Sequence, residues 1–161
     1  MDTLNELSEQ VGLALKKKGW LLATAESVTG GGISQLITDI AGSSEWFDCG
    51  FTTYSNSSKT QFLGVPEALI AQLGAVSEEV AAEMAKGALV NTHADVALST
   101  TGIAGPAGAV PGKPVGTVCF GWAHSKIIHT ERLVFSGDRR AVREQTIIHA
   151  LRGLLKFLER C

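Results

Sequence analysis

The stretch "ATAESVTGGGISQL", residues 23–36, places a glutamate, a serine and a threonine directly before three consecutive glycines. An apolar run, "WLLATA", leads into it and is typical of a buried strand. From Gly30 to Ile40 a helix is expected, because the apolar residues Ile33, Leu36, Ile37 and Ile40 recur at helical spacing. The stretch therefore predicts a strand–turn–helix junction. Glycine allows a sharp turn or a close approach of backbone to ligand, and the hydroxyls beside it either cap the helix or take part in chemistry.

The rest of the chain continues this alternation. Helices are expected over residues 4–18, around 59–63, from Pro66 to Leu73, after the capping residue Ser77, and over 138–158. Strands are expected at 47–55, 94–102, 115–123 and 127–135, the last two joined near Ser125 and Lys126. We therefore expect an α/β fold: a single layered α/β/α domain over residues 1–161 with a mixed, mostly parallel sheet of about five strands.

Composition excludes several classes of protein. The 161 residues are 45% hydrophobic and 19% charged, with a net charge of −2, which gives no general attraction for nucleic acid or an anionic membrane. There is no signal peptide pattern and no apolar run long enough to span a bilayer, so a cytoplasmic location is expected. Three widely spaced cysteines and four scattered histidines predict neither a disulfide framework nor a metal site.

The common nucleotide-binding and hydrolase motifs are missing. The glycines at 30–32 and at 102, 105 and 108 do not form GxGxxG, and "GKP" at 112–114 has proline where a P-loop needs serine or threonine. A GxSxG elbow is missing as well. We therefore expect neither a dinucleotide cofactor nor a P-loop triphosphate.

Three polar segments follow predicted strands: "AESVTGGG", "TYSNSSK" and "STTGIAGPAG". Ligands of such sheets bind outside the carboxyl ends of the strands, so the segments are expected to share one site. Each alone has a plainer interpretation: a helix cap, a solvated Lys59 and a connecting loop. Together they permit a hydrolase in which a neutral lysine takes the proton from Ser27. Backbone N–H groups of the "TGGG" turn would then hold a phosphate or an oxyanion.

Several motifs in the same order cover nearly the whole chain: "ATAESVTGGGIS", "ITDIAGSSEWF", "GFTTYSNSSK", "LGV", "GAVSEEV", "STTGIAGPAG", "KPVGTV" and "FSGDRRAVREQ". Together they closely resemble the CinA C-terminal domain family, whose stand-alone bacterial members include nicotinamide mononucleotide (NMN) deamidases. The resemblance implies an amidohydrolase that converts NMN to nicotinate mononucleotide and ammonia in pyridine nucleotide recycling, without a cofactor. It also implies a homo-oligomer, with a dimer favoured.

The resemblance also implies roles for particular residues. Ser27 would be the nucleophile, Lys59 the general base and Tyr54 a helper. Thr101 would line the substrate pocket, and the glycines after Ser27 would clear a space for substrate. The full set of expected substrate-binding residues is Glu26, Thr29, Gly30, Gly31, Thr101, Gly102, Gly105, Arg139 and Arg143.

Two of these assignments leave alternatives open. Arg139, Arg140 and Arg143 lie in the first turns of a predicted helix, where positive charge opposes the macrodipole. A bound phosphate would relieve that conflict, and a solvated basic surface is the alternative. Glu26 either orients Lys59 or the substrate's pyridinium, or caps the turn.

One residue departs from the family's pattern. Many relatives have cysteine at the position of Val28, which changes the wall beside the expected nucleophile. Two further functions are therefore weighed against NMN hydrolysis: a non-catalytic paralogue that binds a pyridine nucleotide or a protein partner, and a Ser–Lys amidase for another small amide. Retention of Ser27, Tyr54 and Lys59 together favours an enzyme.

Overall fold

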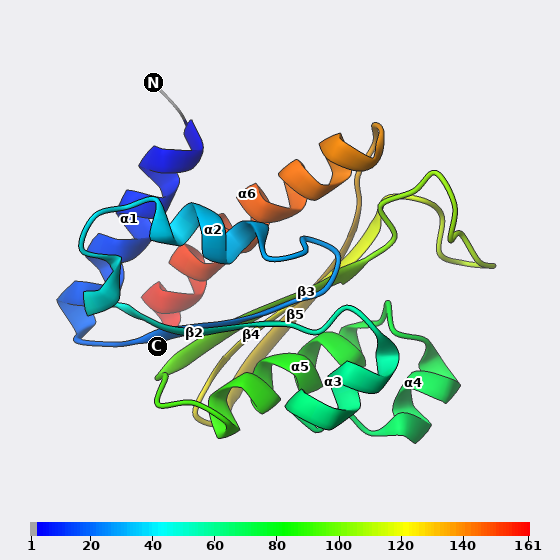
Figure 1. Ribbon diagram of the computed structural model, residues 1–161, viewed down its shortest axis with the longest axis horizontal. Coiled ribbons are helices and arrows are strands. Elements are labelled where there is room, and N and C mark those ends of the chain that lie inside the picture. The colour runs from blue at the N-terminus through cyan, green and yellow to red at the C-terminus, as the bar shows by residue number, and fades with distance from the viewer. Residues whose placement is uncertain (1–2) are drawn as a thin grey trace.

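A computed structural model describes residues 3–161, in which five strands form one sheet between two layers of helices (Figure 1). The strands are β1 (Leu22–Glu26), β2 (Phe47–Thr52), β3 (Val96–Gly102), β4 (Thr117–His124) and β5 (Ile127–Val134). The helices are α1 (Thr3–Lys18), α2 (Gly32–Thr38), α3 (Asn56–Leu63), α4 (Glu67–Leu73), α5 (Glu78–Val90) and α6 (Arg139–Arg160), with a 3-10 turn, η1, at Ser43–Glu45. Within the described range, none of the helices has the length and apolar character to cross a membrane.

The strand order is β2-β1-β3-β4-β5. β1 pairs in parallel with β2 and β3, whereas β3 with β4 and β4 with β5 are antiparallel. The expected mixed sheet of five strands is confirmed. Parallel and antiparallel pairings are nevertheless equal in number, so the sheet is less parallel than expected. The reason is that the chain returns from β3 to β4 through a loop at the same edge, and a return without a crossover gives an antiparallel pair.

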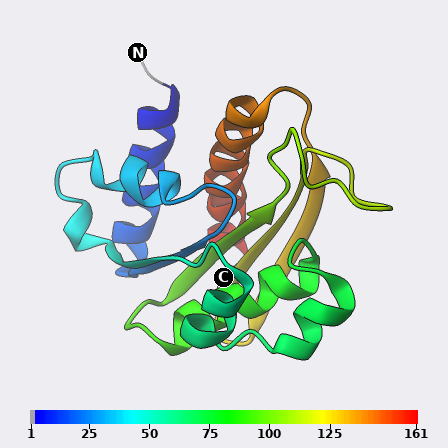
Figure 2. The ribbon, with the colours of Figure 1, turned by 45° about the vertical axis from the view of Figure 1, so that its right-hand side comes forward.

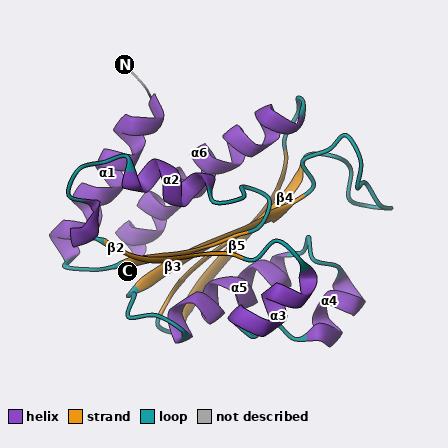
Figure 3. Cartoon of the chain, viewed as in Figure 1, coloured by secondary structure: helices purple, strands orange, loops and turns teal. Residues whose placement is uncertain are grey.

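Each face of the sheet is covered by its own helices (Figure 3). α1, α2 and α6 pack on one face, where Val11, Leu15 and Leu154 are fully buried in the larger core cluster. α3, α4 and α5 pack on the other face around Val80 and Met84. The apolar periodicity of the sequence had predicted these buried faces, because residues at helical spacing share one side of a helix.

Element boundaries differ from the predictions mainly at the carboxyl ends of strands. α2 begins at Gly32 rather than Gly30, because Gly30 and Gly31 adopt left-handed backbone conformations with φ of 60° and 95°. β2 ends at Thr52, and Ser55 caps α3 by accepting from the N–H of Ser58. The predicted cap at Ser77 is confirmed, since its side chain accepts from the N–H of Val80.

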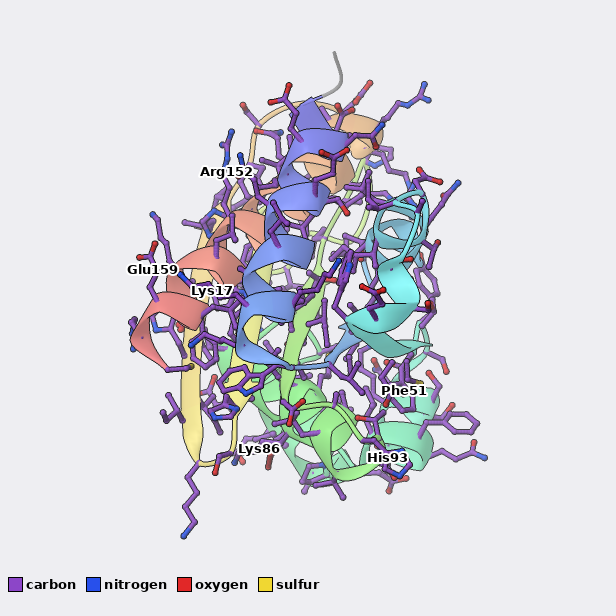
Figure 4. All side chains as sticks on the ribbon, turned by 90° about the vertical axis from the view of Figure 1, so that its left-hand side faces the viewer. Lys17, Phe51, Lys86, His93, Arg152 and Glu159 are labelled. Atoms are coloured by element: carbon purple, nitrogen blue, oxygen red, sulfur yellow. The ribbon has the colours of Figure 1, made fainter. Side chains whose placement is uncertain are left out.

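The parallel arrangement brings the carboxyl ends of β1, β2 and β3 to one edge of the sheet. Figure 2 shows this edge turned forward, with the long loop between β3 and β4 extending beyond it. Figure 4 views the molecule from the opposite end, where Lys17 projects from α1, and Arg152 and Glu159 project from α6. The polar segments that the sequence predicted to share a site meet at the edge of the sheet where β1, β2 and β3 end.

Candidate active site

Ser27 and Lys59 meet at the carboxyl edge of the sheet. Ser27 follows β1 directly, and its backbone N–H donates to the carbonyl of Thr100 on β3 at 2.9 Å. Lys59 lies in the first turn of α3 and reaches inward, so that its Nζ is 3.1 Å from the Ser27 Oγ. The exposed fractions are 7% for Ser27 and 1% for Lys59. The predicted juxtaposition of the two strand-end segments is present.

The Lys59 amine is surrounded by oxygen acceptors that carry no charge. Its Nζ donates to the carbonyls of Thr53 and Tyr54, both at 3.0 Å. In the described part of the chain Lys59 forms no salt bridge. Burial lowers the pKa of the Lys59 amine from its ordinary value of 10.5, because an ammonium loses hydration that no counter-ion replaces here.

The same contacts orient the lone pair of the neutral Lys59 amine. A neutral amine has two N–H groups and one lone pair, and a carbonyl oxygen can only accept. When both N–H groups serve Thr53 and Tyr54, the lone pair is left for the hydroxyl of Ser27. This is the arrangement that a general base needs in order to take a proton from a nucleophile.

A cleft of about 300 Å³ opens above this pair. Seven of the residues expected to form the site line it: Ser27, Tyr54, Lys59, Thr101, Gly102, Gly105 and Arg139. Val28 lines it as well, as expected for the wall beside the nucleophile. Sequence reasoning had not singled out the remaining lining residues: Asn56, Ala75, Val76, Ile103, Ala104, Ala107 and Gly108. Asn56 belongs to the "YSN" segment and residues 103–108 to "STTGIAGPAG", so these motifs could have supplied them, whereas Ala75 and Val76 carry no chemical signal in the sequence.

Glu26 caps a helix, and in the part of the chain that the structure describes its carboxylate forms neither a hydrogen bond nor a salt bridge with Lys59. Its fully buried carboxylate accepts from the Thr29 hydroxyl at 2.5 Å, from the backbone N–H groups of Ile33 and Ser34 at 2.9 and 3.0 Å, and from the Ser34 hydroxyl at 3.0 Å. Glu26 is not among the residues that line the cleft. Of the two interpretations, the cap is therefore the one present in the structure.

The cap also changes the interpretation of the "TGGG" turn. The carboxylate of Glu26 occupies the N-terminus of α2, so the anion site expected there is already filled by the protein itself. Thr29 lies behind the cleft, with its hydroxyl on Glu26 and 3.0 Å from the hydroxyl of Thr100. The N–H of Gly30 donates to the carbonyl of Ser27 at 3.0 Å. Thr29, Gly30 and Gly31 do not line the cleft.

The three glycines allow close packing. A Cβ on Gly30 would lie 3.3 Å from the Arg143 Nη2, and one on Gly32 would lie 2.9 Å from the Ile147 Cδ1. Both neighbours belong to α6. Gly30 and Gly32 thus bring the turn after β1 against α6. None of the three glycines lines the cleft, so their expected place beside the substrate stays a prediction without support from this geometry.

The two arginines assigned to the phosphate occupy different places. Arg139 lines the cleft, where its Nη1 donates to the Gly105 carbonyl at 2.9 Å and its Nη2 to the Tyr54 hydroxyl at 3.2 Å. Arg143 lies outside the cleft, and its Nε and Nη2 donate to the carbonyls of Val28 and Thr29 at 3.2 and 3.1 Å. Among residues 3–161 neither arginine forms a salt bridge.

The far wall of the cleft is fixed by Thr101. Its hydroxyl donates to the carbonyl of Ala75 at 2.9 Å, which ties the end of β3 to the segment before α5. Gly102 follows, where a Cβ would lie 2.8 Å from a methyl group of Val118. The hydrogen bond of Thr101 thus fixes the end of β3 to the cleft wall at Ala75, and the missing Cβ of Gly102 allows β4 to pack closely against β3.

The chain is similar to known proteins over nearly its whole length. Residues 4–158 match the family model described as the CinA C-terminal domain. The nicotinamide-nucleotide amidohydrolase PncC of Pseudomonas putida is 49% identical over 98% of this chain and 98% of its own length, and that of Escherichia coli K12 is 56% identical over 94% and 92%. The crystal structure of a competence-damaged protein (CinA) superfamily protein from Klebsiella pneumoniae superposes with a TM-score of 0.96 at 37% identity, over 99% of this chain and 100% of that one.

Proposed function

Because the chain belongs to the CinA C-terminal domain family, we propose that it is a nicotinamide-nucleotide amidohydrolase, which converts NMN and water to nicotinate mononucleotide and ammonia. The name of the two relatives, which match nearly end to end, supports the substrate and the reaction. The observation that carries the chemistry is the buried Lys59 amine, which has no counter-ion among residues 3–161 and lies 3.1 Å from the Ser27 hydroxyl.

The proposed reaction begins with the neutral amine of Lys59. It takes the proton of Ser27 while Oγ attacks the carboxamide carbon of NMN, and the resulting ammonium is held by the carbonyls of Thr53 and Tyr54. The tetrahedral intermediate collapses with transfer of that proton to the leaving nitrogen, which departs as ammonia. Lys59 then takes a proton from water, whose oxygen attacks the acyl-enzyme. Collapse of the second intermediate frees the carboxylic acid, which then loses its proton to water, and Lys59 returns its own proton to Ser27.

The developing oxyanion needs donors beside the nucleophile. The backbone N–H of Val28 follows Ser27 directly, and it has no hydrogen-bond partner within residues 3–161. Val28 also lines the cleft, so we assign this N–H the role. Arg139, on the rim of the same cleft, would meet the phosphate of NMN, since its charge has no carboxylate partner and a guanidinium binds phosphate well.

Two other features belong to the proposal. The cytoplasmic location and the homo-oligomer expected from the sequence stay predictions.

Val28 lines the cleft with an exposed fraction of 6%. Its side chain has no polar atom, so it forms an apolar wall and makes no hydrogen bond to Ser27 or Lys59. We therefore expect the substitution from cysteine to leave the chemical step in place.

Ammonia release from NMN by the purified full chain tests the proposed function. We expect turnover with NMN, weaker turnover with nicotinamide riboside, and none with Ser27→Ala, since the nucleophile is gone. Ser44→Ala, which changes an exposed serine on η1, is the matched control and should keep full activity. A wild-type protein that binds NMN in calorimetry but releases no ammonia would instead be the non-catalytic paralogue. Full activity in a folded Ser27→Ala protein would eliminate Ser27 as nucleophile.

A further inference from the structure

Arg143 joins two parts of the chain that are more than a hundred residues apart in sequence. It lies on α6, and its Nε and Nη2 donate to the carbonyls of Val28 and Thr29, which are successive carbonyls of the turn after Ser27. A planar guanidinium can make two such bonds in fixed directions, whereas an ammonium cannot. Gly30 permits this approach, because a Cβ there would lie 3.3 Å from Nη2.

These contacts fix the direction of a peptide group beside the nucleophile. In a trans peptide the C=O and N–H bonds point in opposite directions. Because the Val28 carbonyl is turned toward Arg143, the N–H of Thr29 is turned away from it. The bond from Arg143 to the Thr29 carbonyl holds the next peptide, whose N–H is that of Gly30. This N–H donates to the Ser27 carbonyl, so the N–H of Val28 in the Ser27–Val28 peptide points away from Gly30. Both N–H groups are without a partner in the described chain.

Arg143 is poorly placed to bind substrate itself. It is not among the residues that line the cleft with Ser27 and Lys59, although Arg139, one turn earlier on α6, is. Both of its side-chain hydrogen bonds within residues 3–161 go to the protein backbone. The charge is therefore directed at the turn rather than at the cleft.

We propose that Arg143 is a positioning residue, which holds the turn after Ser27 so that the N–H of Val28, a residue of the cleft wall, meets the oxyanion of the reacting amide. This inference rests on the proposed function. It separates the two arginines of the "GDRRAVR" segment: Arg139 recognises the phosphate, and Arg143 orients the donor for the transition state. An oxyanion donor acts only when charge develops, so its loss lowers kcat and leaves ground-state binding nearly unchanged.

The test compares Arg143→Lys and Arg143→Ala with Arg139→Ala in the full chain, using NMN and nicotinamide riboside. We expect both Arg143 variants to lose about 10- to 100-fold in kcat, the scale of a weakened oxyanion contact. The KM for NMN and the preference for NMN over the riboside should stay within about two-fold of wild type, by the same reasoning about transition-state contacts. Arg139→Ala should instead raise KM and narrow the preference.

A second measurement excludes a purely structural effect. 3-Pyridineboronic acid can form a tetrahedral adduct with Ser27. Its inhibition constant should rise in both Arg143 variants, whereas the affinity for nicotinate mononucleotide should not change. If Arg143→Ala does not fold, Arg143→Lys with both measurements decides alone. Unchanged kcat and boronate affinity, or a raised KM with a narrowed preference, would overturn the role assigned to Arg143. A wild-type protein inert toward NMN would overturn the proposed function alone, and the boronate affinities would still test Arg143.

Discussion

Two buried charged side chains lie near Ser27, and the protein treats them in opposite ways. Glu26, fully buried, is surrounded by four hydrogen-bond donors from Thr29, Ile33 and Ser34. Lys59, equally buried, has only two neutral carbonyls and a hydroxyl around its amine. Charge that is satisfied stabilises structure, whereas charge that is desolvated without a partner shifts its pKa and becomes available for chemistry.

The comparison also separates what each group contributes to folding. The Glu26 carboxylate occupies the N-terminus of α2, where the helix dipole and the free N–H groups favour an anion. No such compensation reaches Lys59, and burial lowers the pKa of its amine. The Glu26 carboxylate therefore stabilises the turn that carries Ser27, and the Lys59 amine activates the Ser27 hydroxyl.

The largest expected effect comes from Lys59→Arg. A guanidinium keeps its proton at any working pH and cannot act as a base, so kcat/KM for NMN should fall by about 10²–10⁴-fold, the range typical of general bases. Lys59→Met, which removes the amine that accepts the proton, should be inactive as well. The control is Lys86→Arg on α5, which changes an exposed lysine paired with Glu83 and should keep wild-type activity. Wild-type activity in Lys59→Arg would remove Lys59 from the mechanism and direct the search to Tyr54.

Glu26→Gln should act on stability more than on chemistry. Its amide presents N–H groups where Ile33 and Ser34 also donate, so at least one hydrogen bond to a charged acceptor is lost, which costs about 1.5–3 kcal/mol. Urea unfolding measures this loss in the free energy of unfolding. Glu45→Gln, which removes an exposed salt bridge to Lys16, is the control with an expected change below about 1 kcal/mol. An unaltered free energy of unfolding together with abolished activity would place Glu26 in the chemistry and end the contrast with Lys59.

Arg139→Ala should change recognition alone. Loss of a charge-assisted contact to phosphate is expected to raise KM for NMN by about ten-fold, while kcat changes little. Nicotinamide riboside, which has no phosphate, should be hydrolysed as before, and steady-state kinetics with both substrates measures the difference. Equal effects on both substrates would show that the hydrogen bonds of Arg139 to Gly105 and Tyr54 only shape the cleft.

The smallest effect concerns Glu131, a partly exposed carboxylate on β5. Burial alone would raise its pKa, but hydrogen bonds with His129 and His149, at 2.9 and 2.6 Å, lower the pKa by more than burial raises it. The net pKa of Glu131 therefore lies below the ordinary 4.5. A depressed pKa contributes stability above the unfolded value, and that stability is lost as pH falls through the folded pKa. The free energy of unfolding of wild type should exceed that of Glu131→Gln near pH 6 and approach it below the folded pKa. A difference independent of pH would contradict this assignment.

Much of the fold could be predicted from the sequence because it depends on local periodicity. The apolar spacing in α1, α5 and α6 and the cap at Ser77 are readable from neighbouring residues, and the structure confirms them. The start of α2 was misplaced because it depends on left-handed glycines at 30 and 31, whose conformation is set by packing across the molecule.

The site was only partly predictable, for a related reason. Ser27 and Lys59 could be selected because their side chains carry the chemistry. The carbonyls of Thr53 and Tyr54 that direct the amine belong to the backbone and have no signature in the sequence. Gly30 was assigned to substrate because its partner, Arg143, is distant along the chain. The sequence also does not distinguish a glutamate that caps a helix from one that binds a ligand, and Glu26 is such a case.

The pH dependence of kcat/KM for NMN, measured on the wild-type protein from about pH 6 to 10.5, tests whether Lys59 acts as a neutral base. Lys59 is inactive while protonated, and burial lowers the pKa of its amine from 10.5. Activity should therefore rise with pH through one ionisation below 10.5 and reach a plateau before that value. A rate that continues to rise through pH 10.5, as an unperturbed lysine would give, or a rate independent of pH, would contradict a desolvated Lys59 as the base that activates Ser27.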